Sequence, residues 1–144
     1  MRRLALLAAF VAALLAAPSR ADIVVVADPD KWIEQALKDL TQGRTDEFAR
    51  NFLALIDKPG NFDSFAGNLR PLGRLGSPLF LEKISDVSVG TVMREVNYLA
   101  LFGRTNYTYF KFTMKKNRGG WLISNFEFKV EPADLYPKDF ATPK

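Results

Sequence analysis

The chain has 144 residues, with 20 Lys and Arg against 16 Asp and Glu, and it contains neither cysteine nor histidine. These absences exclude disulfides, Ser-His-Asp and Cys-His nucleophile pairs, and metal sites built from thiolate or imidazole ligands. Any catalysis must use carboxylates, Lys, Tyr or hydroxyls, and stability must come from apolar burial and backbone hydrogen bonds.

Residues 1–21 are predicted to be an export signal. The segment starts with MRR, continues as an apolar run over 4–17, and ends in Ser19-Arg20-Ala21, where a signal peptidase recognises small residues. The apolar run has 14 residues, which span about 21 Å as a helix, whereas a bilayer core is roughly 30 Å thick, so no stable membrane anchor is expected. Cleavage after Ala21 is predicted, and Ala27 offers a second cleavage site.

The mature chain, residues 22–144, is predicted to be one domain in the periplasm or outside the cell. Without the three arginines of the leader, seventeen Lys and Arg face sixteen Asp and Glu, for a net charge of +1. The basic pI of the whole chain therefore reflects the leader, and no nucleic-acid partner is expected.

Two amphipathic helices are predicted after the leader. The first covers residues 29 to about 42, because Asp28 can cap its free amides and Pro29 suits its first position. The second runs from residue 45 or 46 to about 57 and ends before Pro59-Gly60. Residues 62–72 could form a third, short helix, although Gly67 and Pro71 disfavour its far end.

From about residue 78 the apolar residues alternate, which predicts an antiparallel meander of four strands over residues 79–89, 92–102, 106–115 and 121–130. In the third strand, Phe110 and Phe112 are predicted to face the helices. In the fourth, Phe126 and Phe128 share one face, while Trp121 and Ile123 lie on the other. The tail from about residue 131 is proline-rich and is predicted to be an irregular strap.

This order of elements resembles the nuclear-transport-factor-two-like superfamily, also called cystatin-like or SnoaL-like. The residues that carry the resemblance are Trp32, the helix-Gly-helix step over 40–48, the segment 70–73, and the Gly-Gly-Trp-Leu-Ile sequence at 119–123. The resemblance implies an α+β cone in which two or three N-terminal helices pack on a curved antiparallel four-stranded sheet. It also implies a pocket at the wide end and often a dimer through the outer sheet face.

The resemblance does not select an activity, because the superfamily contains isomerases, dehydratases, hydrolases and binding modules. Its isomerase-like members use an Asp base with a Tyr or acid as hydrogen-bond donor. Asp86, Tyr98 and Tyr109 are therefore the residues to screen for acid-base chemistry. The alternative is that Asp86 is an exposed strand residue and that both tyrosines simply pack on the sheet. No cofactor and no metal are expected.

Two sets of apolar residues are candidates for binding. The first could line a cavity for a small apolar ligand or simply form the core, and it comprises Trp32, Phe48, Phe52, Phe62, Phe65, Phe110, Phe112 and Phe126. The second could form an interface on the outer face, for a homodimer or a protein partner, and it comprises Tyr107, Tyr109, Trp121 and Ile123.

The turn between the third and fourth strands carries Lys115, Lys116 and Arg118 and is interpreted as a solvated turn rather than a patch for an anionic polymer. The sequence as a whole predicts an exported binding or interaction module. The alternative is a metal-free isomerase or hydrolase that uses a carboxylate and a tyrosine in a pocket under the helices.

Overall fold

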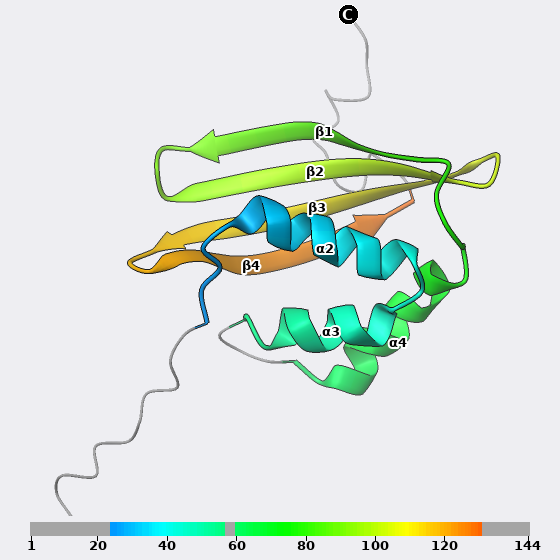
Figure 1. The fold of residues 1–144 in the computed structure, drawn as a ribbon, viewed down its shortest axis with the longest axis horizontal. Coiled ribbons are helices and arrows are strands. Elements are labelled where there is room, and N and C mark those ends of the chain that lie inside the picture. Colours follow the sequence, from blue (N-terminus) through cyan, green and yellow to red (C-terminus); the bar gives the residue numbers. More distant parts are fainter. Residues whose placement is uncertain (1–23, 57–59, 131–144) are drawn as a thin grey trace, which may run out of the picture.

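A computed structural model describes residues 24–56 and 60–130, so the predicted leader and the predicted C-terminal strap lie outside the described residues. Within these two ranges, no helix is long and apolar enough to span a bilayer. Three helices precede four strands (Figure 1): α2 Pro29–Thr41, α3 Thr45–Leu53, α4 Phe62–Gly73, β1 Phe80–Val89, β2 Met93–Phe102, β3 Asn106–Asn117 and β4 Gly120–Lys129.

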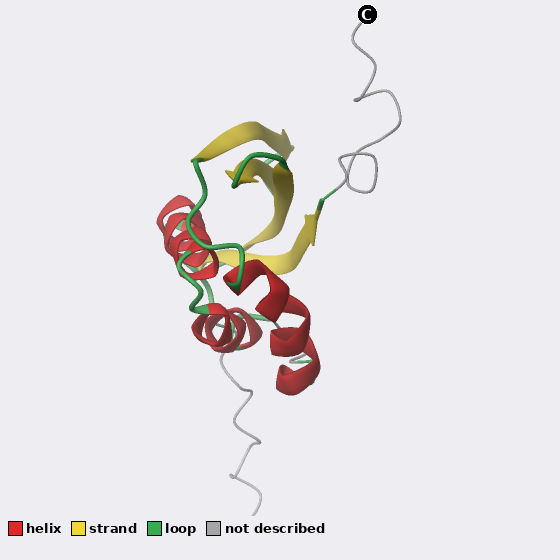
Figure 2. Ribbon diagram, turned by 90° about the vertical axis from the view of Figure 1, so that its right-hand side faces the viewer, coloured by secondary structure: helices red, strands yellow, loops and turns green. Residues whose placement is uncertain are grey.

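The four strands form one antiparallel sheet in chain order, β1-β2-β3-β4. Gly90 and Gly103 adopt φ values of 57° and 60° in the first two turns, which residues with a Cβ rarely take. Figure 2 shows that the sheet is strongly bent and that the helices gather on one side of it. The predicted α+β class is confirmed, with the third helix present.

Side-chain caps mark the starts of α2 and α4. The Asp28 carboxylate accepts a hydrogen bond from the backbone N–H of Lys31 at 3.2 Å, and Pro29 is the first residue of α2. Asn61 caps α4 in the same way. Helix α4 continues through Pro71, because this proline lies on the exposed side, where water can replace the missing backbone bond.

Helix α3 is shorter than the sequence predicts, since it ends at Leu53 rather than near residue 57. The chain tightens there, with the N–H of Leu55 donating to the carbonyl of Phe52 at 3.0 Å. Leu55 nevertheless remains buried, with 8% of its surface exposed. The apolar pattern of the sequence therefore continues past the end of the helix, since Leu55 packs on the core without being helical.

The core lies between the helices and the concave face of the sheet. Phe110 and Phe112 of β3 have no exposed surface and face the helices as predicted. Their partners across the strands are Tyr98 and Val96 of β2, which are also buried. Aromatic and β-branched neighbours of this kind stabilise the strand pairing in addition to the burial itself.

A bulge at Ser124 reverses the predicted orientation of residues at the start of β4. Thr113 pairs with Asn125, whereas the next residue, Met114, pairs with Ile123. Ile123 therefore shares the inner face with Met114 and has no exposed surface, and Trp121 also packs on the core. The prediction that Trp121 and Ile123 face outward is wrong, because the extra residue breaks the alternation on which it depended.

The N-terminal segment joins the free edge of β4. Val26 and Trp121 exchange two backbone hydrogen bonds, of 2.7 and 2.8 Å. A Cβ on the neighbouring Gly120 would lie 2.7 Å from the carbonyl oxygen of Val26, so only glycine permits this approach. The first described residues are thereby fixed to the last strand.

Candidate functional site

The eight aromatic residues that were candidates for a pocket form one cluster between the helices, β3 and β4. Phe126 lies at its centre, with ring centroids 4.8 Å from Phe48 and 5.0 Å from Phe112. Trp32 meets the Phe112 ring edge-on at 6.2 Å, and Phe52 stacks on Phe65 at 5.3 Å. Rings at these distances contact one another directly, so the set mainly forms the core. Phe62 and Phe110 complete it.

A surface cavity of about 320 Å³ lies between α2 and α3, beside this cluster. Its size is at the lower end of the range for small-molecule sites. Its apolar part is formed by Trp32, Ala36, Phe48 and Leu55, and its polar part by Gln35, Asp39 and Asn51. Two members of the predicted pocket set, Trp32 and Phe48, thus line an opening to solvent.

The polar groups of the cavity differ in what they already bind. One oxygen of Asp39 accepts hydrogen bonds from Gln35 Nε2 at 2.8 Å and from Arg44 Nε at 3.0 Å. Arg44 also pairs with Glu47, at 3.2 Å. The Asn51 side chain is exposed, and its amide makes no hydrogen bond with a described residue. The charge of Asp39 is therefore compensated within the protein, while the Asn51 amide is available for a ligand.

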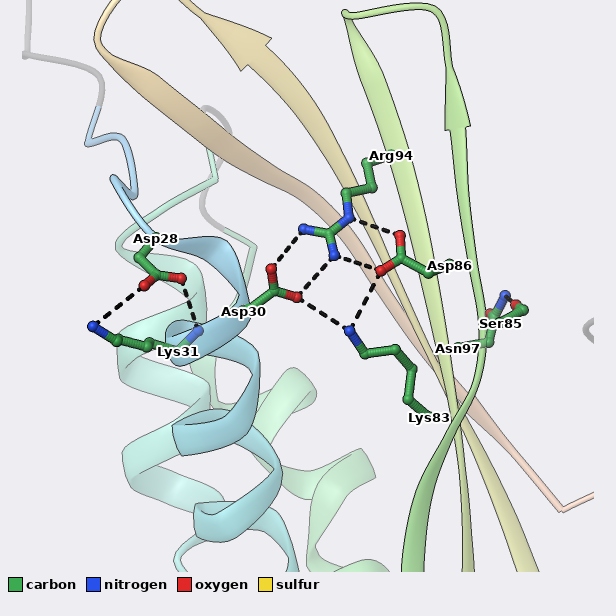
Figure 3. A network of polar contacts seen from close by, with 8 residues as sticks. All are labelled: Asp28, Asp30, Lys31, Lys83, Ser85, Asp86, Arg94 and Asn97. Atoms are coloured by element: carbon green, nitrogen blue, oxygen red, sulfur yellow. Dashed lines mark hydrogen bonds and ion pairs between the residues drawn. The ribbon is translucent and has the colours of Figure 1, made fainter.

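A second polar site joins the start of α2 to β1 and β2 (Figure 3). Arg94 donates to both oxygens of Asp30, at 2.8 and 2.9 Å, and its Nε donates to Asp86 at 2.8 Å. Lys83 Nζ lies 3.4 Å from each of the two carboxylates. Two cations and two anions thus form a network with no net charge. Only 16% of the Arg94 side chain is exposed.

The network changes the acidity of its members. Hydrogen bonds from Arg94 hold the pKa values of Asp30 and Asp86 below their ordinary range, and the positive charges of Arg94 and Lys83 add to this effect. The hydrogen bonds that Arg94 donates to Asp86 and Asp30 in turn raise the pKa of Arg94. Partial burial lowers the pKa of Lys83. The interactions with Tyr98, Asp86 and Asp30 outweigh this effect, so the pKa of Lys83 is raised. The four groups therefore remain charged at neutral pH.

The residues screened for acid-base chemistry do not come together as a set. Asp86 and Tyr98 share the concave face, whereas Tyr109 pairs with Leu99 and Lys129 on the convex face. Burial raises the pKa of Tyr98, and no hydrogen bond joins its hydroxyl to a carboxylate among the described residues. A carboxylate with a lowered pKa is a weak base, so Asp86 in its ion pairs is poorly suited to abstract a proton.

The convex face carries the remaining interface candidates. Tyr107 has 44% of its surface exposed, Tyr109 is half-buried, and the Tyr107 ring lies 6.4 Å from that of Phe80. On the same face, Asn97 is 1% exposed and donates to the Ser85 hydroxyl at 2.6 Å. Dimerisation through this face stays a prediction.

Sequence reasoning missed the network and the polar part of the cavity. A signal for the network existed: Arg94 occupies an inward position of β2, in phase with Val96 and Tyr98. A charged residue at such a position requires charged partners. Its partner Asp30 could be placed only once the start of α2 was known to cross this part of the sheet. Among the residues that the structure describes, no three carboxylates are grouped to hold a metal ion.

Comparisons with known proteins add the following. No protein-family model matches the sequence, and no curated protein matches it either. The structure is similar to that of a proposed NTF2-like transpeptidase from Campylobacter jejuni, with a TM-score of 0.46 and 16% identity over 69% of this chain and 99% of that one. The order of helices and strands is the one that the resemblance to the nuclear-transport-factor-two-like superfamily implies.

Proposed function

We propose that this protein is an exported binding module that takes a small amphipathic molecule into the cavity between α2 and α3. The observation that carries the proposal is the composition of that cavity. Aromatic and aliphatic side chains form its apolar part, and the unbonded amide of Asn51 stands at its exposed side. A few polar groups around an apolar surface are typical of small-molecule sites.

The charges around the cavity indicate what kind of ligand it suits. Arg44 already compensates Asp39, so a cationic ligand would compete with a short internal ion pair. An anionic ligand would meet the carboxylate of Asp39 itself. A neutral molecule with an aromatic or aliphatic body and one hydroxyl or amide fits both the apolar part and the Asn51 amide.

The place of action belongs to the same proposal and is supported by the sequence of residues 1–21. A charged start, a short apolar run and small residues before the cleavage point are the features of a secretory signal. The module would thus meet its ligand in the periplasm or outside the cell.

The test uses the chain produced with its own leader. Extraction and mass spectrometry would identify small molecules that remain bound, and naphthol, a neutral aromatic alcohol, would serve as a defined probe in calorimetry. Asn51→Trp should fill the cavity and weaken naphthol binding by about tenfold or more. Asn51 is exposed, so this change leaves the core intact.

The matched control is Asn68→Trp, which places the same side chain on the exposed surface of α4. This variant should bind naphthol as the original protein does. The proposal is rejected if the original protein neither retains a small molecule nor binds naphthol, or if both variants bind equally.

A further inference from the structure

Two hairpin turns lie at the same end of the sheet. Val89, the last residue of β1, pairs with Met93, and Met93 pairs with Lys115 near the end of β3. The β3–β4 turn follows directly, where Asn117 pairs with Gly120. Figure 1 shows the β1–β2 and β3–β4 turns side by side at this end. We refer to residues 87–93 and 115–120 as the hairpin end.

The β1–β2 part of the hairpin end is apolar and exposed. Val87, Val89 and Val92 have 53%, 57% and 63% of their surface exposed. Residues 87–93 include no charged side chain. Single exposed valines are common on soluble proteins, but three within six residues of one hairpin suit an interaction.

The β3–β4 part of the hairpin end is cationic. Lys115, Lys116 and Arg118 are exposed, and none of them forms an ion pair with a described residue. The ammonium group of Lys116 lies 4.8 Å from the centre of the Trp121 ring, which positions it beside an aromatic residue. Residues 115–121 include no acidic side chain, so the three charges are not compensated locally.

The N-terminal segment reaches the fold at the same end. Val26 is hydrogen-bonded to Trp121, next to the β3–β4 turn, and Val24 is 52% exposed. The apolar run over 4–17 is separated from Val24 by the six residues 18–23, which span at most about 20 Å when extended. If the leader engages a membrane before cleavage, this short segment connects that membrane to the part of the fold beside the hairpin end.

We propose that the hairpin end binds reversibly to the surface of a bilayer that contains anionic lipids. The valines would enter the interfacial region, and the three cations would meet lipid phosphates, a combination that neither group provides alone. An anionic polymer would use the cations but would leave the valines in water. The exposed valines therefore favour a lipid surface.

The experiment measures binding of the exported protein to vesicles of phosphatidylcholine alone and to vesicles of an equal mixture with phosphatidylglycerol. Any retained leader is common to all variants and does not affect their comparison. The original protein should prefer the anionic vesicles, and salt should weaken its binding. Lys115→Gln, Lys116→Gln and Arg118→Gln together should weaken it roughly 100-fold, at about fivefold for each cation.

The apolar contribution is tested separately with Val89→Ser and Val92→Ser combined, which should weaken binding to the anionic vesicles by about tenfold. The matched control combines Arg70→Gln, Arg74→Gln and Arg104→Gln, three exposed arginines outside the hairpin end. This control removes the same charge and should bind nearly as the original protein does. Circular dichroism would verify that each variant is folded.

Three results would overturn the proposal. The first is no preference of the original protein for anionic vesicles. The second is equal loss in the hairpin-end and control arginine variants, which would indicate a nonspecific effect of net charge. The third is a pair of results. Salt would weaken binding to polyphosphate no more than it weakens binding to vesicles, and the serine variant would bind vesicles as the original protein does. This pattern would assign the cations to an anionic polymer.

Discussion

Helix α2 contacts the two halves of the same sheet in different ways. On β3, Trp32 of this helix packs edge-on against Phe112, which has no exposed surface. Against β1 and β2 it places Asp30 in ion pairs with Arg94 and Lys83, where 42% of the Asp30 side chain remains exposed. Apolar burial supplies most of the free energy of folding, whereas partly exposed ion pairs contribute little net energy but have strict geometry.

This difference indicates a division of roles along one helix. The aromatic contacts stabilise the domain but would tolerate small shifts of the helix, because dispersion forces are not directional. The Arg94 guanidinium instead bonds both oxygens of Asp30 at fixed distances and orients the helix start relative to the sheet.

The largest expected effect on stability comes from removing an aromatic contact between α2 and β3. Phe112→Ala should lower the free energy of unfolding by about 3–5 kcal/mol, because it removes a fully buried ring and leaves a cavity among its neighbours. Urea unfolding followed by circular dichroism measures this loss. Tyr107→Ala, at an exposed position of the same strand, should cost less than about 1 kcal/mol. Equal losses in the two variants would contradict the assignment of Phe112 to the core.

Disrupting the ion-pair network of Asp30, Lys83, Asp86 and Arg94 should lower the free energy of unfolding by a smaller amount. Arg94→Gln should lower the free energy of unfolding by about 1–2 kcal/mol, because it leaves Asp30 and Asp86 close to each other with only Lys83 to compensate them. Arg94→Lys should restore part of the loss, since lysine keeps the charge but not the bidentate bonds. A variant Arg94→Gln as stable as the original protein would show that the network adds no stability.

Acid should remove the contribution of the network selectively. The pKa values of Asp30 and Asp86 are lowered in the folded protein, so their contribution is present above the unfolded value of about 3.9 and is lost as the pH falls through the folded values. The stability difference between the original protein and Arg94→Gln should therefore shrink below about pH 4. Urea unfolding at pH 7 and pH 3 tests this, and an unchanged difference would exclude the two aspartates as its source.

The smallest effect concerns the cap of α2. Asp28→Ala should lower the free energy of unfolding by about 1 kcal/mol, because the first-turn amide of Lys31 loses its acceptor. Asp28→Asn should lower the free energy of unfolding by only a few tenths of a kcal/mol, since asparagine caps helices equally well. Thermal unfolding separates the two variants. A large loss in Asp28→Asn would instead assign the role to the negative charge.

Much of the fold could be predicted, because the helices and most of the strands obey simple periodicities. Capping by Asp28 and the alternation in β3 each depend on adjacent residues, and both predictions are confirmed. The failure at Ile123 arose where one extra residue, Ser124, interrupts the alternation. The irregular spacing of Trp121, Ile123, Phe126 and Phe128 contained this information, since a single phase cannot place all four on one face.

The candidate sites were less predictable, because they depend on contacts between segments far apart in the sequence. Asp86 was selected for its residue type, but its chemistry is set by Arg94 and Asp30, which belong to other elements. The cavity likewise requires the spacing of α2 and α3, which no local pattern gives. Trp32 and Phe48, two of the predicted pocket residues, line this cavity, whereas Asn51 was not among the predicted residues.

The pairing of Val26 with Trp121 bears on the order in which the domain is completed. Val26 is among the first residues of the described fold to be synthesised, and Trp121 among the last. The sheet edge therefore cannot close until the chain has been synthesised beyond residue 121, which makes these two backbone bonds a late step in the folding of the described residues. A chain that ends before β4 would instead present the unpaired edge of β3 to its surroundings.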